Sequence, residues 1–165
     1  MTIQQSNVVL GLGNTMHGDD GIGIYVMEQL RDDILPFADV YVTEEMGLSL
    51  LDFLSGYQQA IIVDSVKTDT GTEGQVHCFG LRDFAALPYC GCHQVGLPEM
   101  SLLAKKMGIP FPSSVYILGI EINDPYQVSN SLSPAMQQKL PELVQQVKHQ
   151  IWQILKPVTG SVANR

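Results

Sequence analysis

Three residues that lie far apart in the sequence have side chains suited to binding a divalent metal ion. Asp20 lies in the glycine-rich segment 11–23 (GLGNTMHGDDGIG), Asp64 follows the apolar run 60–63 (AIIV), and His93 lies in the segment 90–96 (CGCHQVG). Two carboxylates and an imidazole are ligands that Ni²⁺ or Zn²⁺ accepts. Three protein ligands would leave coordination positions open for a group that a substrate supplies.

Each of the three residues also has a purely structural explanation. Asp19 and Asp20 stand at the start of a predicted helix, where at least one of them is expected to act as the N-cap. Asp64 could be a turn former at the end of its strand, and a lone loop histidine such as His93 is more often solvated than a ligand. The metal interpretation therefore depends on whether the fold brings the three residues together.

The glycine-rich segment does not fit a dinucleotide-binding loop. Such a loop needs glycine at its first, third and sixth positions, which here are Gly11, Gly13 and Met16. The carboxylates of Asp19 and Asp20 would also repel a pyrophosphate at the helix start.

The cysteines and the remaining candidates give weaker signals. Cys90 and Cys92 have Cys-x-Cys spacing with no second pair, which argues against a structural zinc site. Cys78 falls in a predicted strand, and His77 beside it is expected to face solvent. No Gly-x-Ser-x-Gly motif and no protease-like cysteine context marks a nucleophile.

Apolar runs and helical periodicities alternate along the chain and predict the elements that would position these residues. Strands are predicted at 7–12, 40–43, 60–63, 75–79 and 115–122, and helices at 19–30, 48–54, 98–107 and 134–155. Ser133 is expected to cap the last helix, with Pro134 at its first position and with Pro141 kinking or splitting it. The alternation predicts an α/β fold, namely a three-layer α/β/α domain with a mostly parallel sheet of about five strands. Ligands of such sheets bind beyond the carboxyl ends of the strands, where the three candidate ligands are expected to lie.

Composition limits the function classes further. The 165 residues are 45% hydrophobic, which fits one globular domain over residues 1–157, with a frayed tail at 158–165. Nine Lys and Arg against 17 Asp and Glu give a net charge of -8, which argues against a nucleic-acid partner. The first residues lack the features of a secretory signal, and no stretch approaches the roughly 20 apolar residues of a membrane span. With only three cysteines, we expect a cytoplasmic protein with reduced thiols and no membrane partner.

In combination, these segments resemble the hydrogenase maturation endopeptidases. The matching blocks are VVLGLGN with GDDGIG, MGLSLLDFL, IIVDS, HQVGL and LGIE, at 8–14 with 18–23, 46–54, 61–65, 93–97 and 118–121. They occur in order, so the resemblance extends over nearly the whole chain.

The resemblance implies a twisted sheet flanked by helices, of the phosphorylase/hydrolase-like type. It implies an endopeptidase that removes the C-terminal extension of a nickel–iron hydrogenase large-subunit precursor after nickel insertion. The family's metal-contacting and catalytic positions fall on Asp20, Asp64 and His93, which would contact nickel that the precursor supplies. Gly11 and Gly13 would then let the chain turn tightly after the first strand, approach the neighbouring backbone and deliver Asp20 to the sheet edge.

We also expect a monomer that needs no organic cofactor. Asp20 stands where some family members have Glu, and CGCHQVG looks most like the maturases of bidirectional NAD(P)-linked hydrogenases. Two alternatives remain open, namely a zinc-dependent peptidase of similar fold and a non-enzymatic metallocentre chaperone or binding module. The sequence also does not decide whether nickel activates the scissile carbonyl or a water, or whether a carboxylate acts as general base.

Overall fold

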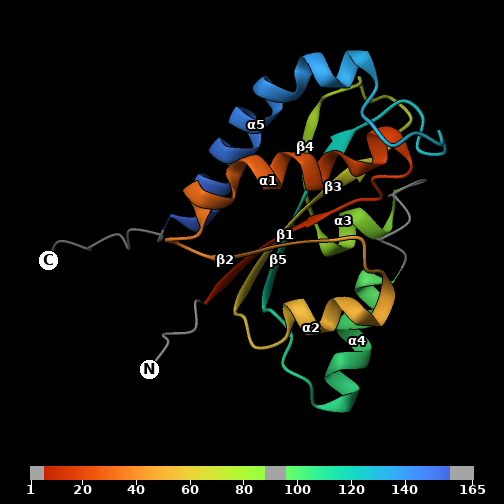
Figure 1. Ribbon diagram of the computed structural model, residues 1–165. Helices are drawn as coiled ribbons and strands as arrows, with labels where there is room; N and C mark the ends of the chain where they lie inside the picture. Colours follow the sequence, from red (N-terminus) through yellow and green to blue (C-terminus); the bar gives the residue numbers. More distant parts are fainter. Residues whose placement is uncertain (1–5, 88–95, 157–165) are drawn as a thin grey trace, which may run out of the picture.

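The computed structural model describes residues 6–87 and 96–156, which form three layers (Figure 1). The middle layer is a five-stranded sheet of β1 (Asn7–Leu12), β2 (Asp39–Thr43), β3 (Gln59–Val66), β4 (Val76–Gly80) and β5 (Ser114–Glu121). One face carries the helices α1 (Ile22–Ile34) and α5 (Pro134–Leu155). The other face carries α2 (Leu51–Leu54), α3 (Leu81–Ala85) and α4 (Leu97–Met107). Two 3-10 turns, η1 (Gly18–Gly21) and η2 (Gly47–Leu50), precede α1 and α2. The predicted three-layer α/β architecture is confirmed.

The strands follow the order β2-β1-β3-β5-β4, and only the pairing of β4 with β5 is antiparallel. The chain leaves β1 through α1 to reach β2, and then returns through α2 to β3 on the other side of β1. The direction of winding therefore reverses between β1 and β3. In open α/β sheets, the crevice at such a reversal is the usual place for a ligand.

The central strands are buried on both faces, which explains their continuous apolar sequences. In β1, Val9 faces the core formed with α1 and α5, whereas Val8 and Leu10 face the core formed with α2 and α4. In β3, Ile61 and Ile62 divide between the two cores in the same way. A strand with two apolar faces has few positions for polar residues until it nears the end of the sheet.

The predicted end of β3 is wrong, and of the two outcomes predicted for Pro141, a kink or a split of the last helix, the split does not occur. The strand β3 does not end at Asp64 but continues to Val66, because Ser65 and Val66 pair with Ile120 and Glu121 of β5. The helix α5 is not split at Pro141, since it runs unbroken from Pro134 to Leu155. The buried apolar stripe of α5 outweighs the backbone hydrogen bond that a proline cannot make.

The starts of α5 and α1 differ in how well the sequence predicted them. Ser133 caps α5 as predicted, because its side chain accepts a hydrogen bond of 3.2 Å from the Met136 N–H. The first helix begins later than predicted, at Ile22, because η1 precedes it. The short helix α3 was not predicted. None of the helices that the structure describes is long and apolar enough to span a membrane.

Candidate functional site

Glycines bring the segment after β1 unusually close to the neighbouring strands. A Cβ atom at Gly23 would overlap the carbonyl oxygens of Leu12 in β1 and Val63 in β3. A Cβ atom at Gly13 would lie 2.8 Å from the carbonyl oxygen of Asp20. The expected close approach of backbone at Gly13 is confirmed, and Gly23 has the same role. As a result, η1 packs on β3, and the start of α1 packs on the carboxyl ends of β1 and β3.

This packing brings together two of the three predicted ligands, through Ser65. The Ser65 hydroxyl donates a hydrogen bond of 2.5 Å to Asp20 Oδ1, and the Ser65 backbone N–H lies 2.7 Å from Asp64 Oδ1. All three residues are completely buried. Neighbouring side chains of a strand point to opposite faces, so Ser65 turns toward α1 while Asp64 turns toward the layer of α2 and α4. Asp20 therefore contacts the end of β3 from the side of α1, whereas the Asp64 side chain lies on the opposite face of the sheet.

The capping role predicted for Asp19 or Asp20 is wrong. Gly21 is the N-cap of α1, and no side chain caps that helix. Asp19 Oδ1 instead accepts a hydrogen bond of 2.7 Å from the Ser133 N–H at the start of α5. Both aspartates lie within η1, before the first turn of α1, and their carboxylates contact other elements.

The third predicted ligand, His93, lies outside the described residues, as do Cys90 and Cys92. Within residues 6–87 and 96–156, no three His, Cys, Asp or Glu side chains are grouped so that they could hold a metal ion. Burial raises the pKa of the Cys78 thiol above its ordinary value. Cys78 is therefore not an activated thiolate, in agreement with the lack of a nucleophile motif in the sequence.

A further buried carboxylate at the same edge was not predicted from the sequence. Glu121, at the end of β5, accepts hydrogen bonds of 2.6 Å from the Thr68 N–H and 3.0 Å from the Thr68 hydroxyl. Its Oε2 also lies 3.0 Å from His77 Nε2. The expectation that His77 faces solvent is wrong, because its side chain is 20% exposed and its ring stacks on Phe79. The signal in the sequence was a single charged residue inside the apolar run 115–122.

Glu121 lies on the same face of the sheet as Asp64. Asp64 pairs with Gly119 and Val66 pairs with Glu121, so alternate residues of the two strands share that face. By binding Thr68, the Glu121 carboxylate fixes the loop that follows β3. This loop begins after Val66, two residues beyond Asp64.

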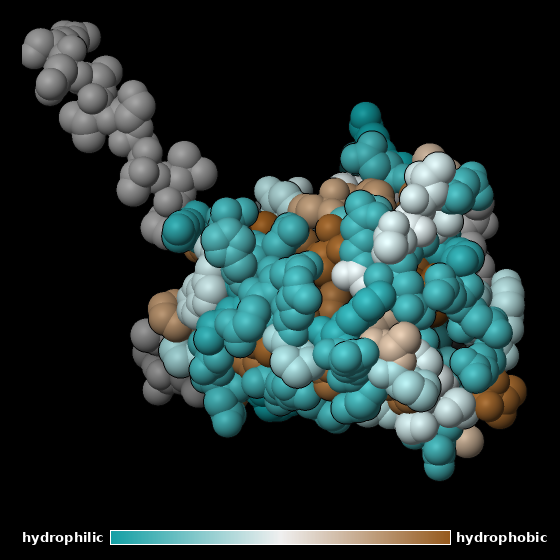
Figure 2. All heavy atoms as spheres, turned by 90° about the horizontal axis from the view of Figure 1, so that it is seen from above, coloured by the Kyte–Doolittle hydropathy of each residue, from teal (hydrophilic) through white to brown (hydrophobic). Residues whose placement is uncertain are grey.

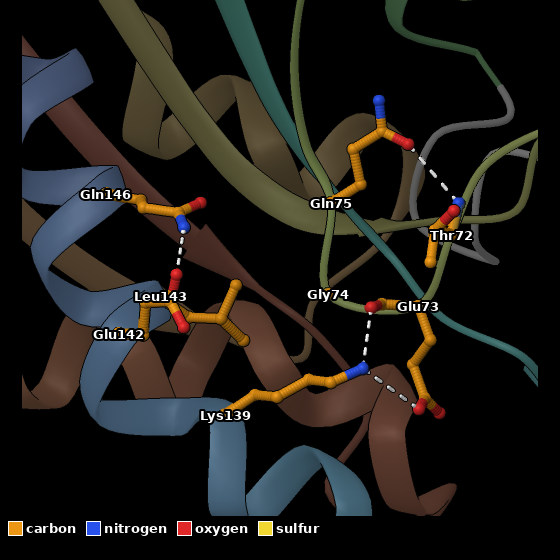
Figure 3. A pocket seen from close by; sticks show the side chains of 8 residues that line it. All are labelled: Thr72, Glu73, Gly74, Gln75, Lys139, Glu142, Leu143 and Gln146. Carbon is orange, nitrogen blue, oxygen red and sulfur yellow. Dashed lines mark hydrogen bonds and ion pairs between the residues drawn. The ribbon is translucent and has the colours of Figure 1, made fainter.

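The far end of the same loop is held against α5 (Figure 3). Lys139 Nζ donates a hydrogen bond of 2.8 Å to the Glu73 carbonyl oxygen and lies 3.4 Å from its carboxylate. The loop and α5 enclose a cavity of about 350 Å³ that includes Gln75 and Leu143 in its walls. Neither Asp20 nor Asp64 lines this cavity, so it is separate from the candidate site.

The fold and the site together define an α/β protein with two buried carboxylates at the reversal point of its sheet. The sequence matches the HycI family model, described as hydrogenase maturation protease, over residues 24–150, and the chain belongs to that family. The matched region includes the positions of Asp64 and His93 and begins just after Asp20.

Individual relatives agree with this assignment. The chain is 25% identical over 144 residues to the hydrogenase 2 maturation protease of Escherichia coli K12, covering 85% of this chain and 87% of that protein. It is 23% identical over 137 residues to the hydrogenase expression/formation protein HupD of Thiocapsa roseopersicina, covering 81% of this chain. The match spans only 62% of that HupD protein.

A solved structure supports the fold. The hydrogenase maturating endopeptidase HybD from Escherichia coli superposes with a TM-score of 0.71 at 21% identity, over 89% of this chain and 92% of HybD. The arrangement of sheet and helices is thus shared with a hydrogenase maturation enzyme.

Proposed function

We propose that this chain is an endopeptidase that removes the C-terminal extension from the large-subunit precursor of a nickel–iron hydrogenase. The observation that carries the proposal is the placement of Asp20 and Asp64, in a member of the hydrogenase maturation protease family, at the reversal point of the sheet. Their segments are far apart in sequence, and Ser65 contacts both carboxylates.

The nickel ion belongs to the precursor and is part of the substrate. We propose that Asp20, Asp64 and His93 add ligands to it from the enzyme side. Carboxylate oxygen and imidazole nitrogen both suit Ni²⁺. A precursor without nickel would lack these contacts, so the enzyme would act only after nickel insertion, through a difference in binding affinity.

Two routes of peptide hydrolysis fit these residues. Nickel held by the precursor can polarise the scissile carbonyl or lower the pKa of a bound water. Alternatively, the carboxylate of Asp20 or Asp64 can accept the proton of the attacking water as general base. In both routes, Ser65 orients the Asp20 carboxylate through its hydroxyl.

The test is the intact mass of a cognate large-subunit precursor after incubation with the enzyme, with and without nickel loading. We expect loss of one C-terminal peptide only from the nickel-loaded precursor. The Asp64→Asn variant should fold, as judged by circular dichroism, and should lose cleavage. Asp32→Asn, at an exposed position of α1, is the matched control and should cleave normally.

Other results would favour another function. Cleavage that needs zinc bound stoichiometrically to the enzyme would indicate a zinc-dependent peptidase. A stable complex with an uncleaved precursor would indicate a metallocentre chaperone. We also propose that the enzyme acts as a monomer in the cytoplasm, which light scattering and cell fractionation would test.

A further inference from the structure

The loops at the carboxyl edge of the sheet, the edge that also carries the candidate site, expose large apolar side chains. Met46 and Leu48, between β2 and α2, are 52% and 59% exposed, and Met16, between β1 and η1, is equally prominent. By contrast, mostly hydrophilic side chains cover the face formed by α1 and α5 (Figure 2). Exposed apolar side chains gathered at one edge are typical of a surface that binds a protein partner.

Segment 46–48 separates two pockets of different chemistry. Met46 lines an open pocket of about 540 Å³ whose other walls are Asn14, Thr43, Glu44 and Glu45. Leu48 lines a smaller, mainly apolar pocket of about 180 Å³ whose other walls are Gly47, Gly96, Glu99, Met100 and Leu103. Among the described residues, no Lys or Arg lines either pocket. A partner seated here would gain from apolar contacts at Leu48 and from positive charge near the glutamates.

The first pocket is connected to the segment that carries Asp20. Glu44 Oε1 accepts hydrogen bonds of 2.8 Å from the Thr15 N–H and 2.6 Å from the Thr15 hydroxyl. Asn14, beside Thr15, is itself a wall of the pocket. A peptide lying over segment 46–48 would therefore pass next to the loop that leads into η1.

We propose that segment 46–48 and its two flanking pockets bind an extended segment of the precursor that is apolar and positively charged. Successive side chains of an extended peptide point in opposite directions, so neighbouring residues can enter two adjacent pockets. The apolar side chain would occupy the Leu48 pocket, and the cationic side chain would lie beside Glu45. This inference rests on the proposed function, because it takes the precursor as the occupant.

The test compares two double variants of equal chemistry. Met46→Ser with Leu48→Ser removes the apolar contacts at the site edge. Leu102→Ser with Met107→Ser removes two side chains that are each 63% exposed on α4 and that line neither pocket. For cleavage of the nickel-loaded precursor, we expect the first variant to raise KM by about tenfold with kcat unchanged, since ground-state contacts are lost. The control should keep both constants.

The charge component has a separate test. Glu45→Gln should raise KM and reduce its dependence on salt concentration, whereas Glu28→Gln, exposed on α1, should change neither. An unchanged KM for the Met46/Leu48 variant, with an active wild type, would overturn the docking surface and leave the proposed function intact. If the wild type cleaves nothing, the proposed function fails. In that case the Kd of each variant for the precursor, measured by calorimetry, still decides whether this surface binds the precursor.

Discussion

Replacing Ser65 with alanine should lower both the stability of the fold and the rate of cleavage. The Ser65 hydroxyl is completely buried and donates a hydrogen bond of 2.5 Å to the Asp20 carboxylate. Removing a hydrogen bond to a charged group costs about 1.5–3 kcal/mol. For a chain of this length, each kcal/mol lowers Tm by roughly 2–4 °C, so we expect a decrease of roughly 3–12 °C.

The effect on cleavage follows from the contacts of Asp20. Loss of a group that orients a metal-binding carboxylate typically lowers metal affinity or activity by roughly 10- to 100-fold. We expect a decrease of that size in kcat/KM for the nickel-loaded precursor. The assay is the rate of peptide release followed by mass spectrometry, with Tm measured on the same preparations.

Ser133→Ala is the matched control for this experiment. It removes the N-cap hydrogen bond of α5, at a cost of about 1 kcal/mol, and it leaves the contacts of Asp20 and Asp64 in place. Its Tm should fall while its kcat/KM stays close to that of the wild type. If Ser65→Ala also cleaves at the wild-type rate, the contact between Ser65 and Asp20 has no part in positioning the site, and the reasoning is refuted.

Two further predictions concern the packing around the site. Gly23→Ala should lower the free energy of unfolding by about 3 kcal/mol in urea titrations, because a Cβ would overlap two backbone carbonyls. Gly108→Ala is the control, since a Cβ there has no atom within 4 Å. It should lower the free energy of unfolding by only about 1–2 kcal/mol, because alanine disfavours the positive φ of that position. An equal decrease in the free energy of unfolding for the two variants would show that α1 can move away from the strands at no cost. Glu121→Gln keeps the shape of the side chain but removes its charge, so we expect a loss of about 1–2 kcal/mol. A double-mutant cycle with Thr68→Val should give a coupling energy of at least about 0.5 kcal/mol, and strict additivity would contradict the hydrogen bonds between Glu121 and Thr68.

The fold was predictable because its main elements have strong local signals. The apolar runs of β1 and β3 and the long apolar stripe of α5 each require burial, and the alternation of strands with helices leads to a parallel sheet. Ser133 followed by Pro134 marked the start of α5 in the sequence, and the structure confirms that cap.

The details of strand ends depend on partners that are distant in sequence. β3 continues past Asp64 only because β5 is long enough to pair with Ser65 and Val66. His77 contacts Glu121 only because β4 pairs antiparallel to β5, at the edge of the sheet. Neither the register nor the direction of β4 follows from the residues of β3 or β4 alone, so no local pattern could have predicted the contact between His77 and Glu121.

The two adjacent aspartates of the glycine-rich segment show most clearly what only the structure provides. From spacing alone, Asp19 and Asp20 are equivalent candidates for the N-cap of the predicted helix. In a 3-10 turn, successive side chains point about 120° apart, so two neighbours contact different elements. Asp19 reaches the backbone at the start of α5, and Asp20 reaches Ser65 at the end of β3. Within this one turn, Asp19 therefore holds the start of the last helix, and Asp20 belongs to the candidate site. The insertion of η1 between β1 and α1, and not helix capping, explains why this segment carries two acidic residues in a row.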